Sequence, residues 1–142
     1  SFGPIGKMLI ATGKLPLSAD QIRDHHGPHA VAPPEAGPTK EFGAHLAQVC
    51  VGCHRPSFEG GPIAAGDPDW LPARNLTPHD EGLKDWTEED FFVSMRQMKR
   101  PDGSDIRPPM SLMKPYAKKM TDVELRALWA YLRSTTPVPT GT

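Results

Sequence analysis

Two cysteines and a histidine lie within five consecutive residues, and their spacing suits the covalent attachment of a porphyrin. In the stretch Cys50-Val51-Gly52-Cys53-His54 the thiols stand three positions apart, so each can add across one vinyl group of the same ring. His54 follows the second thiol directly, where its ring can bind iron from one side of the macrocycle. The chain contains only these two cysteines. The motif therefore predicts one covalently bound c-type haem.

Three other readings of the Cys-x-x-Cys spacing are open. A redox disulfide of the thioredoxin type expects a βαβ setting, and no clear βαβ pattern precedes Cys50. A structural zinc site needs four ligands, and no second Cys-x-x-Cys pair or suitably spaced histidine pair follows. Chance occurrence is the plainest alternative. Haem attachment is favoured because the downstream sequence supplies what a haem domain needs.

Length and composition agree with one small haem domain. The chain has 142 residues, 37% of them hydrophobic, with 17 prolines and 13 glycines. This predicts long irregular segments and a modest core, to which a large apolar macrocycle would add. The formal net charge of −1 argues against a nucleic-acid partner, which would need a basic stripe.

Haem attachment also carries an expectation about location. The thiols must have reached an oxidising compartment, so we expect the periplasm or the outer face of the cytoplasmic membrane. The sequence has neither an apolar stretch of about 20 residues nor a recognisable secretory signal. A signal or membrane anchor upstream of Ser1 is compatible with this location.

Residues 1–38 differ in composition from the rest. An apolar run at 2–10 is bounded by glycine and proline, residues 18–22 fit one helical turn, and residues 32–38 are rich in proline. This composition predicts an extended arm rather than a folded subdomain. The arm is a linker, a docking arm or a membrane-proximal segment. Its histidines are expected to be solvated rather than to bind a metal; they are His25, His26 and His29.

Three helices are expected in residues 39–137. The first spans residues 39–50, with Thr39 as N-cap and one apolar face formed by Phe42, Leu46 and Val49. Because a glycine inside a helix is unfavourable, Gly43 in this helix indicates the close approach of a second helix.

The other two helices follow a long loop over residues 55–85, in which Trp70 and Leu76 are candidates for lining the haem. The second starts near Thr87, stops at the sequence Pro-Asp-Gly, and has the apolar residues Phe91, Phe92, Met95 and Met98. The third follows a capping box at 121–124 and has the apolar residues Leu125, Leu128, Trp129 and Leu132. We expect this last helix to pack on the first.

The ligand on the second side of the iron decides between electron transfer and ligand chemistry. The segment 107–115 contains Met110 and Met113 and is expected to be a loop stiffened by prolines. Met110 is favoured, with Met113 as the alternative. The remaining methionines lie in the arm, on helical faces, or at a helix start where core packing is expected. His79, between two helices, is a weaker candidate ligand.

The residues from Phe42 to about Pro137 resemble a class I-type monohaem cytochrome c domain. The resemblance rests on the Cys50–His54 motif and on several later stretches: Asn75-Leu76-Thr77-Pro78, Trp86-Thr87-Glu88-Glu89-Asp90-Phe91, Pro101-Asp102-Gly103, Pro109-Met110, Met120-Thr121-Asp122 and residues 125–133. More specifically, the chain resembles the monohaem cytochromes that serve as electron-transfer modules beside bacterial dehydrogenases and respiratory complexes. Residues 1–40 are only loosely similar to the membrane-proximal arms of some members.

The resemblance implies further details of the site. In the family the axial methionine stands about nine residues past the proline of Pro-Asp-Gly, which points to Met110. Two departures from the family pattern keep Met113 as an alternative. Ser111 stands where a proline usually follows the methionine, and the interval to the next methionine is longer than usual. Pro62 is expected to accept a hydrogen bond from His54 through its carbonyl group. Gly43 and Phe42 are expected to pack against Leu128 and Tyr131.

The resulting prediction is a mainly α, cytochrome c-like fold with three principal helices around the haem, an arm at 1–38 and a tail at 138–142. Its function is electron transfer to or from a periplasmic or membrane-bound oxidoreductase complex, without catalysis of its own. The alternatives are a five-coordinate haem protein that binds a small ligand and a structural haem subunit. One group of basic residues is either a solvated face or a docking patch for an acidic partner: Lys99, Arg100, Lys114, Lys118 and Lys119.

Overall fold

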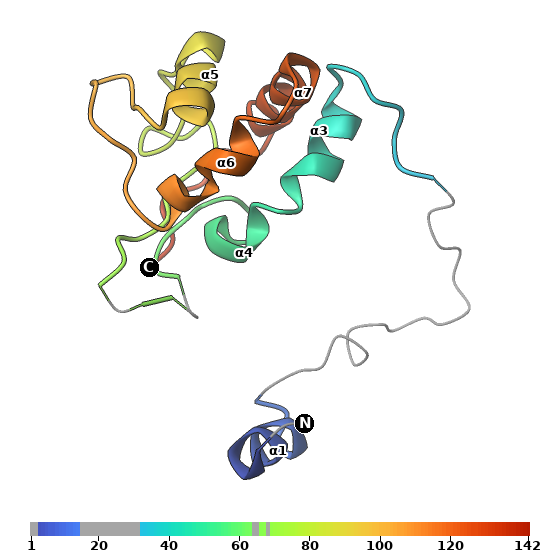
Figure 1. The fold of residues 1–142 in the computed structure, drawn as a ribbon, viewed down its shortest axis with the longest axis vertical. Coiled ribbons are helices and arrows are strands. Elements are labelled where there is room, and N and C mark those ends of the chain that lie inside the picture. The colour runs from blue at the N-terminus through green and yellow to red at the C-terminus, as the bar shows by residue number, and fades with distance from the viewer. Residues whose placement is uncertain (1–2, 15–31, 64–65, 68) are drawn as a thin grey trace. The chain divides into compact units, whose positions relative to one another are not determined.

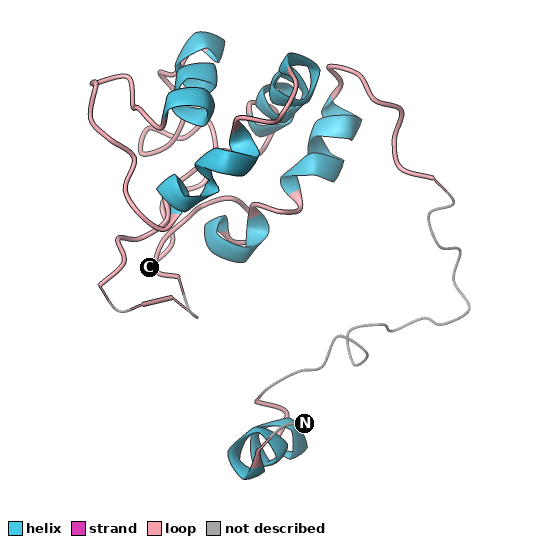
Figure 2. Ribbon diagram, in the orientation of Figure 1, coloured by secondary structure: helices cyan, strands magenta, loops and turns pink. Residues whose placement is uncertain are grey.

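The computed structural model describes residues 3–14, 32–63, 66–67 and 69–142, and these are helix and loop with no strand (Figures 1 and 2). The chain divides into two units, Ser1–Ala32 and Pro33–Thr142. The larger unit contains α3 (Lys40–Ala47), α4 (Val51–His54), α5 (Glu88–Gln97), η1 (Met110–Met113), α6 (Lys114–Ala117) and α7 (Asp122–Leu132). The expected mainly α fold is confirmed.

The three longest helices of the larger unit begin at threonine caps. The hydroxyl oxygen of Thr39 accepts a hydrogen bond from the backbone N–H of Phe42 at 3.2 Å. Thr87 and Thr121 form reciprocal capping boxes with the residues three positions later. Each cap satisfies backbone donors that no helical carbonyl can reach. The predicted starts of all three helices are confirmed.

Helix α3 packs against α7 (Figure 1), and Gly43 allows the two backbones to approach closely. A Cβ atom at Gly43 would lie 2.0 Å from the carbonyl oxygen of Ala127 and 2.8 Å from the Cβ of Tyr131. No side chain fits at this crossing. The expected pairing of the first and last helices is therefore confirmed.

Helix α3 ends three residues earlier than expected. Beyond Ala47 the backbone N–H groups of Gln48, Val49 and Cys50 donate to carbonyls only three residues back, which tightens the chain into a turn before α4. This turn rotates Val49 off the apolar face, so its side chain is 74% exposed. The prediction that Val49 belongs to the buried face is wrong.

The core of the larger unit lies among α3, α5, α7 and the loop between α4 and α5. Its buried members are Ala47, Phe58, Leu83, Phe91, Leu125, Leu128 and Leu132. Phe58 meets Tyr131 edge to face with ring centroids 5.7 Å apart, which joins the loop after α4 to the last helix. Cys50 and Val51, at the start of α4, pack against this core, which places α4 beside it.

Helix α5 ends at Met98, whose backbone is left-handed with φ 59° and ψ 42°. Its side chain is only 4% exposed, and Met95 packs against the core from the preceding turn. The expectation that both methionines serve core packing rather than ligation agrees with this placement.

The segment 107–115 is not the loop that its prolines suggested. Residues 110–113 form the 3₁₀ helix η1, and α6 follows without a break, with Pro115 in its first turn. A proline in the first turn loses no helical hydrogen bond, because N–H groups there have no partner within the helix. The prolines therefore start these short helices instead of preventing them.

In the smaller unit, α1 (Pro4–Ala11) begins with proline in its first turn. The expectation of an extended arm is wrong for these residues, since the apolar run winds into helix with Ile5 74% and Met8 61% exposed. The expected helical turn at 18–22 and the histidines at 25, 26 and 29 lie outside the described residues. None of the described helices has the length and apolar composition needed to cross a membrane.

Candidate functional site

The two cysteines and the histidine of the motif are gathered on one turn of helix. Cys50 is the N-cap of α4, and its carbonyl oxygen accepts from the N–H groups of Cys53 at 3.2 Å and His54 at 2.9 Å. Both thiols are free; that of Cys53 is exposed and that of Cys50 partly exposed. His54 is only 8% exposed. The motif thus presents one exposed and one partly buried thiol beside one fixed imidazole ring.

The ring of His54 is held by a backbone carbonyl. Its Nδ1 atom lies 2.7 Å from the carbonyl oxygen of Arg74. Since a carbonyl oxygen can only accept, Nδ1 carries the proton and Nε2 keeps its lone pair for a metal. The carbonyl was expected to come from Pro62, and that prediction is wrong for this hydrogen bond. An antiparallel bridge between Gly61 and Ala73 instead brings the next residue, Arg74, to the ring.

The environment of these groups favours the neutral forms. Burial lowers the pKa of His54, and the hydrogen bond to Arg74 offsets this only in part. The neutral imidazole is the form that binds iron. Burial raises the pKa of the Cys50 thiol, and the neighbouring Cys53 raises it further. Redox-active cysteine pairs have lowered thiol pKa values, so this environment argues against a thioredoxin-type disulfide.

The described residues also contain no cluster of three or more His, Cys, Asp or Glu side chains that could hold a metal ion. A zinc site built from side chains alone therefore lacks its ligands in this part of the chain.

The two candidate methionines occupy the ends of η1. A 3₁₀ helix has three residues per turn and rises about 2 Å per residue, so Met110 and Met113 share one face at levels about 6 Å apart. Met110 is half-buried, and Met113 is 39% exposed. The two residues therefore occupy the same face of η1.

The other predicted residues are placed differently. Leu76 packs against the core, and its N–H donates to the carbonyl of Phe58 at 2.8 Å. Trp70 is 38% exposed. The Nδ1 atom of His79 accepts from the backbone N–H of Glu81 at 3.2 Å, which ties this ring into its own turn.

Large apolar side chains are exposed just before the motif, in the loop after α4, and in η1 and α6. They are Val49, Leu71, Leu112, Met113 and Tyr116, at 39% to 74%. Water-exposed apolar surface of this kind suits contact with a large apolar group. Together with two free thiols and an imidazole whose Nε2 can bind metal, it fits a covalently attached haem.

Sequence reasoning missed two parts of the site. A backbone carbonyl was expected as the acceptor for His54, but Arg74 supplies it rather than Pro62, and no side-chain pattern distinguishes the two. Asn75, next to it, is 2% exposed, and a buried amide is an unusual residue that needs satisfied hydrogen bonds. The Asn75-Leu76-Thr77-Pro78 stretch supports the family resemblance, but its residue types alone give the asparagine no role.

Comparison with known proteins agrees with this geometry. The sequence profile of the family described as cytochrome c matches residues 41–136. The cytochrome c subunit of an alcohol dehydrogenase (quinone) from Gluconobacter oxydans (strain 621H) is 32% identical over 97 residues, which cover 64% of this chain and 20% of that subunit. The chain thus spans about a fifth of the length of this relative. With its Cys-x-x-Cys-His turn and mainly α fold, the chain belongs to the cytochrome c family.

Proposed function

We propose that this chain transfers electrons through one covalently bound haem c with His54 and a methionine of η1 as axial ligands. The observation that carries the proposal is the 2.7 Å contact between Nδ1 of His54 and the carbonyl oxygen of Arg74. It orients the ring and leaves Nε2 for iron. When bound, the haem supplies one-electron exchange between ferrous and ferric iron.

The residues of the chain have separate tasks in this function. Cys50 and Cys53 tether the macrocycle through thioether bonds, and His54 supplies a fixed nitrogen ligand. A methionine thioether raises the reduction potential, because soft sulfur favours the ferrous ion. The exposed apolar side chains beside the motif and on η1 would exclude water from the macrocycle. Trp70, which is 38% exposed, remains a proposed haem contact.

Met110 is the proposed sixth ligand, with Met113 as its alternative. Met110 has the family's interval from Pro101, and it is more buried than Met113, as a ligand beneath a macrocycle should be. The shared face of the two residues on η1 means that Met113 can approach the same group if Met110 is removed.

The proposed partner is a larger oxidoreductase in an extracytoplasmic compartment. The relative from Gluconobacter oxydans is itself described as a subunit of an alcohol dehydrogenase, which supports a subunit or carrier role. The docking patch proposed from Lys99, Arg100, Lys114, Lys118 and Lys119 is partly neutralised, because Lys99 Nζ lies 2.7 Å from Asp105. A role of residues 1–38 in docking is also retained as a proposal.

Optical and magnetic circular dichroism spectra of the haem-loaded protein test this assignment. The ferric protein should show the weak charge-transfer band of sulfur ligation at the red end of the spectrum. Met110→Ala should shift the band if Met113 takes over, and Met110→Ala combined with Met113→Ala should remove it. Met120→Leu is the matched control, since Met120 packs against the core. High-spin ferric haem in the unmodified protein would contradict the proposal and favour a five-coordinate, ligand-binding haem.

A further inference from the structure

Asn75 is a buried amide whose hydrogen-bonding groups are engaged. It is 2% exposed. Its Nδ2 donates to the carbonyl of Val138 at 2.7 Å, and its Oδ1 accepts from the backbone N–H of Thr77 at 2.8 Å and from the Thr77 hydroxyl at 2.7 Å. A buried amide satisfied in this way is costly to rotate, because rotation would leave desolvated polar atoms without partners.

The same network fixes residues 137–142, here called the C-terminal strap. The N–H of Val138 donates to the hydroxyl oxygen of Thr77 at 3.3 Å, and Thr77 is fully buried. Further along, the N–H of Thr140 donates to Glu81 Oε2 at 2.7 Å, and the N–H of Gly141 donates to the carbonyl of Glu59 at 3.3 Å. The strap is therefore anchored on both sides of the loop that contains Asn75.

The carbonyl group that meets His54 belongs to the peptide unit joining Arg74 to Asn75. Its orientation thus depends on where Asn75 is held. On the other side, the N–H and carbonyl of Ala73 pair with Gly61 at 2.9 and 2.8 Å. Gly60 closes the space from behind, since a Cβ atom there would lie 2.6 Å from the carbonyl carbon of Arg74.

We propose that Asn75 is a positioning residue for electron transfer, which holds the Arg74 carbonyl on His54 and thereby lowers the reduction potential of the haem. The proposal rests on the function proposed above. A strong hydrogen bond from Nδ1 makes Nε2 more basic. A more basic nitrogen stabilises the ferric ion more than the ferrous ion, because the ferric ion has the higher charge. Loss of the Asn75 anchors loosens the carbonyl, weakens that bond and raises the potential.

The test measures midpoint potentials of the full haem-loaded chain. Asn75→Leu removes the amide at similar volume, and we expect about a tenfold shift of the redox equilibrium toward the reduced form, or about 59 mV for one electron. The Nδ1 proton of His54, followed by NMR, should exchange faster with solvent. The spectrum of sulfur ligation should persist, because the opposite ligand is untouched.

Arg74→Ala is the matched control. The side chain of Arg74 is exposed, and the substitution keeps the backbone carbonyl that accepts from His54. Its potential should therefore stay close to that of the unmodified protein.

Two results would overturn the proposal. One is a folded Asn75→Leu protein with lowered stability but unchanged potential and proton exchange, which assigns Asn75 a structural role only. The second result applies if Asn75→Leu does not fold. Thr77→Val then removes the hydroxyl from the same network, and an unchanged midpoint potential in that variant would overturn the proposal. Failure of the proposed function is distinguishable from both, because it would appear as high-spin haem in the unmodified protein.

Discussion

The two sides of the proposed haem site are built in different ways. His54 is 8% exposed, and its ring is held by a carbonyl that is itself fixed by buried polar residues. On the methionine side, η1 contains no buried residue, and Leu112 is 62% exposed. The protein thus organises one proposed ligand by its own packing, whereas the other proposed ligand lies on a short surface helix. Substitutions on the histidine side should change folding and potential, and those on the methionine side should change ligation with little effect on folding.

The largest expected effect concerns the crossing that supports the histidine side. In Gly43→Val the new side chain would collide with the backbone of α7, where even a Cβ atom lies 2.0 Å from a carbonyl oxygen. Overpacking costs about 1–3 kcal/mol even in accommodating cores, so valine should prevent stable folding. Chemical denaturation followed by far-ultraviolet circular dichroism measures this. Gly37→Ala, whose Cβ would have only an ordinary contact at 3.6 Å, is the control; equal stability of the two variants would contradict the close crossing.

A matched pair of leucine truncations compares the two regions directly. Leu125 on α7 is fully buried in the core, whereas Leu112 on η1 is 62% exposed. Leu125→Ala should lower the free energy of unfolding by about 2–5 kcal/mol. Leu112→Ala should change it by less than about 0.5 kcal/mol in the chain without haem. A large cost for Leu112 in haem-free protein would show that η1 is packed independently of the macrocycle.

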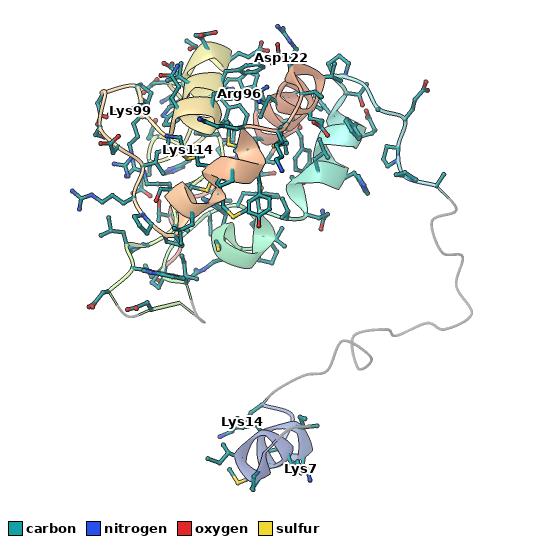
Figure 3. The ribbon with its side chains drawn as sticks, in the orientation of Figure 1. Lys7, Lys14, Arg96, Lys99, Lys114 and Asp122 are labelled. Carbon is teal, nitrogen blue, oxygen red and sulfur yellow. The ribbon has the colours of Figure 1, made fainter. Side chains whose placement is uncertain are left out.

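The attachment of α6 to α5 allows a smaller test of the methionine side. Arg96 donates to the carbonyls of Ala117 at 3.3 Å and Lys118 at 2.9 Å, and it pairs with Asp122 at 2.9 Å (Figure 3). In Arg96→Met the end of α6 loses these bonds, at a cost of about 1 kcal/mol for a partly exposed group.

We expect sulfur ligation in Arg96→Met to be lost at a lower temperature than in the unmodified protein, as followed by the charge-transfer band. Lys99→Met is the control. Lys99 also forms an ion pair, with Asp105, but it lies on the loop after α5 and not at the end of α6 (Figure 3). If both variants lose the band at the same temperature, Arg96 does not support the methionine side.

The smallest effect is the pH dependence of the strap. The hydrogen bond that the backbone N–H of Thr140 donates to Glu81 holds the pKa of Glu81 below its ordinary value near 4.5. A lowered carboxyl pKa stabilises the folded state above the ordinary pKa, and this contribution is lost as the pH falls through the folded-state pKa. Glu81→Gln should therefore reduce the acid sensitivity of unfolding by a small amount, because the group is exposed. Glu35→Gln, on an exposed stretch away from the strap, should leave the pH dependence unchanged.

Local signals accounted for most of the successful predictions. Thr39, Thr87 and Thr121 cap helices through contacts within three residues, so a short stretch of sequence contains the whole interaction. The pairing of α3 with α7 was also accessible, because Gly43 in an apolar face indicates a close backbone neighbour.

The wrong predictions concern features that depend on where a residue lies within the folded backbone. Arg74 is 20 residues from His54, and the bridge that selects its carbonyl over that of Pro62 leaves no mark in residue types. The helices at 110–117 were missed because proline was treated as a breaker, although its position in the first turn is compatible with helix. Both cases depend on the exact place of a residue in its element, which composition does not give.

Met98 illustrates how backbone and side chain can make opposite demands at one position. Its left-handed backbone would cost glycine nothing and costs other residues about 1–2 kcal/mol. Its side chain is 4% exposed, and deletion of such a side chain costs about 2–5 kcal/mol. Methionine is favoured over glycine because the loss of packing would exceed the relief of backbone strain. A buried helix end of this kind is therefore not open to glycine, although glycine is the residue that most often ends a helix in this conformation.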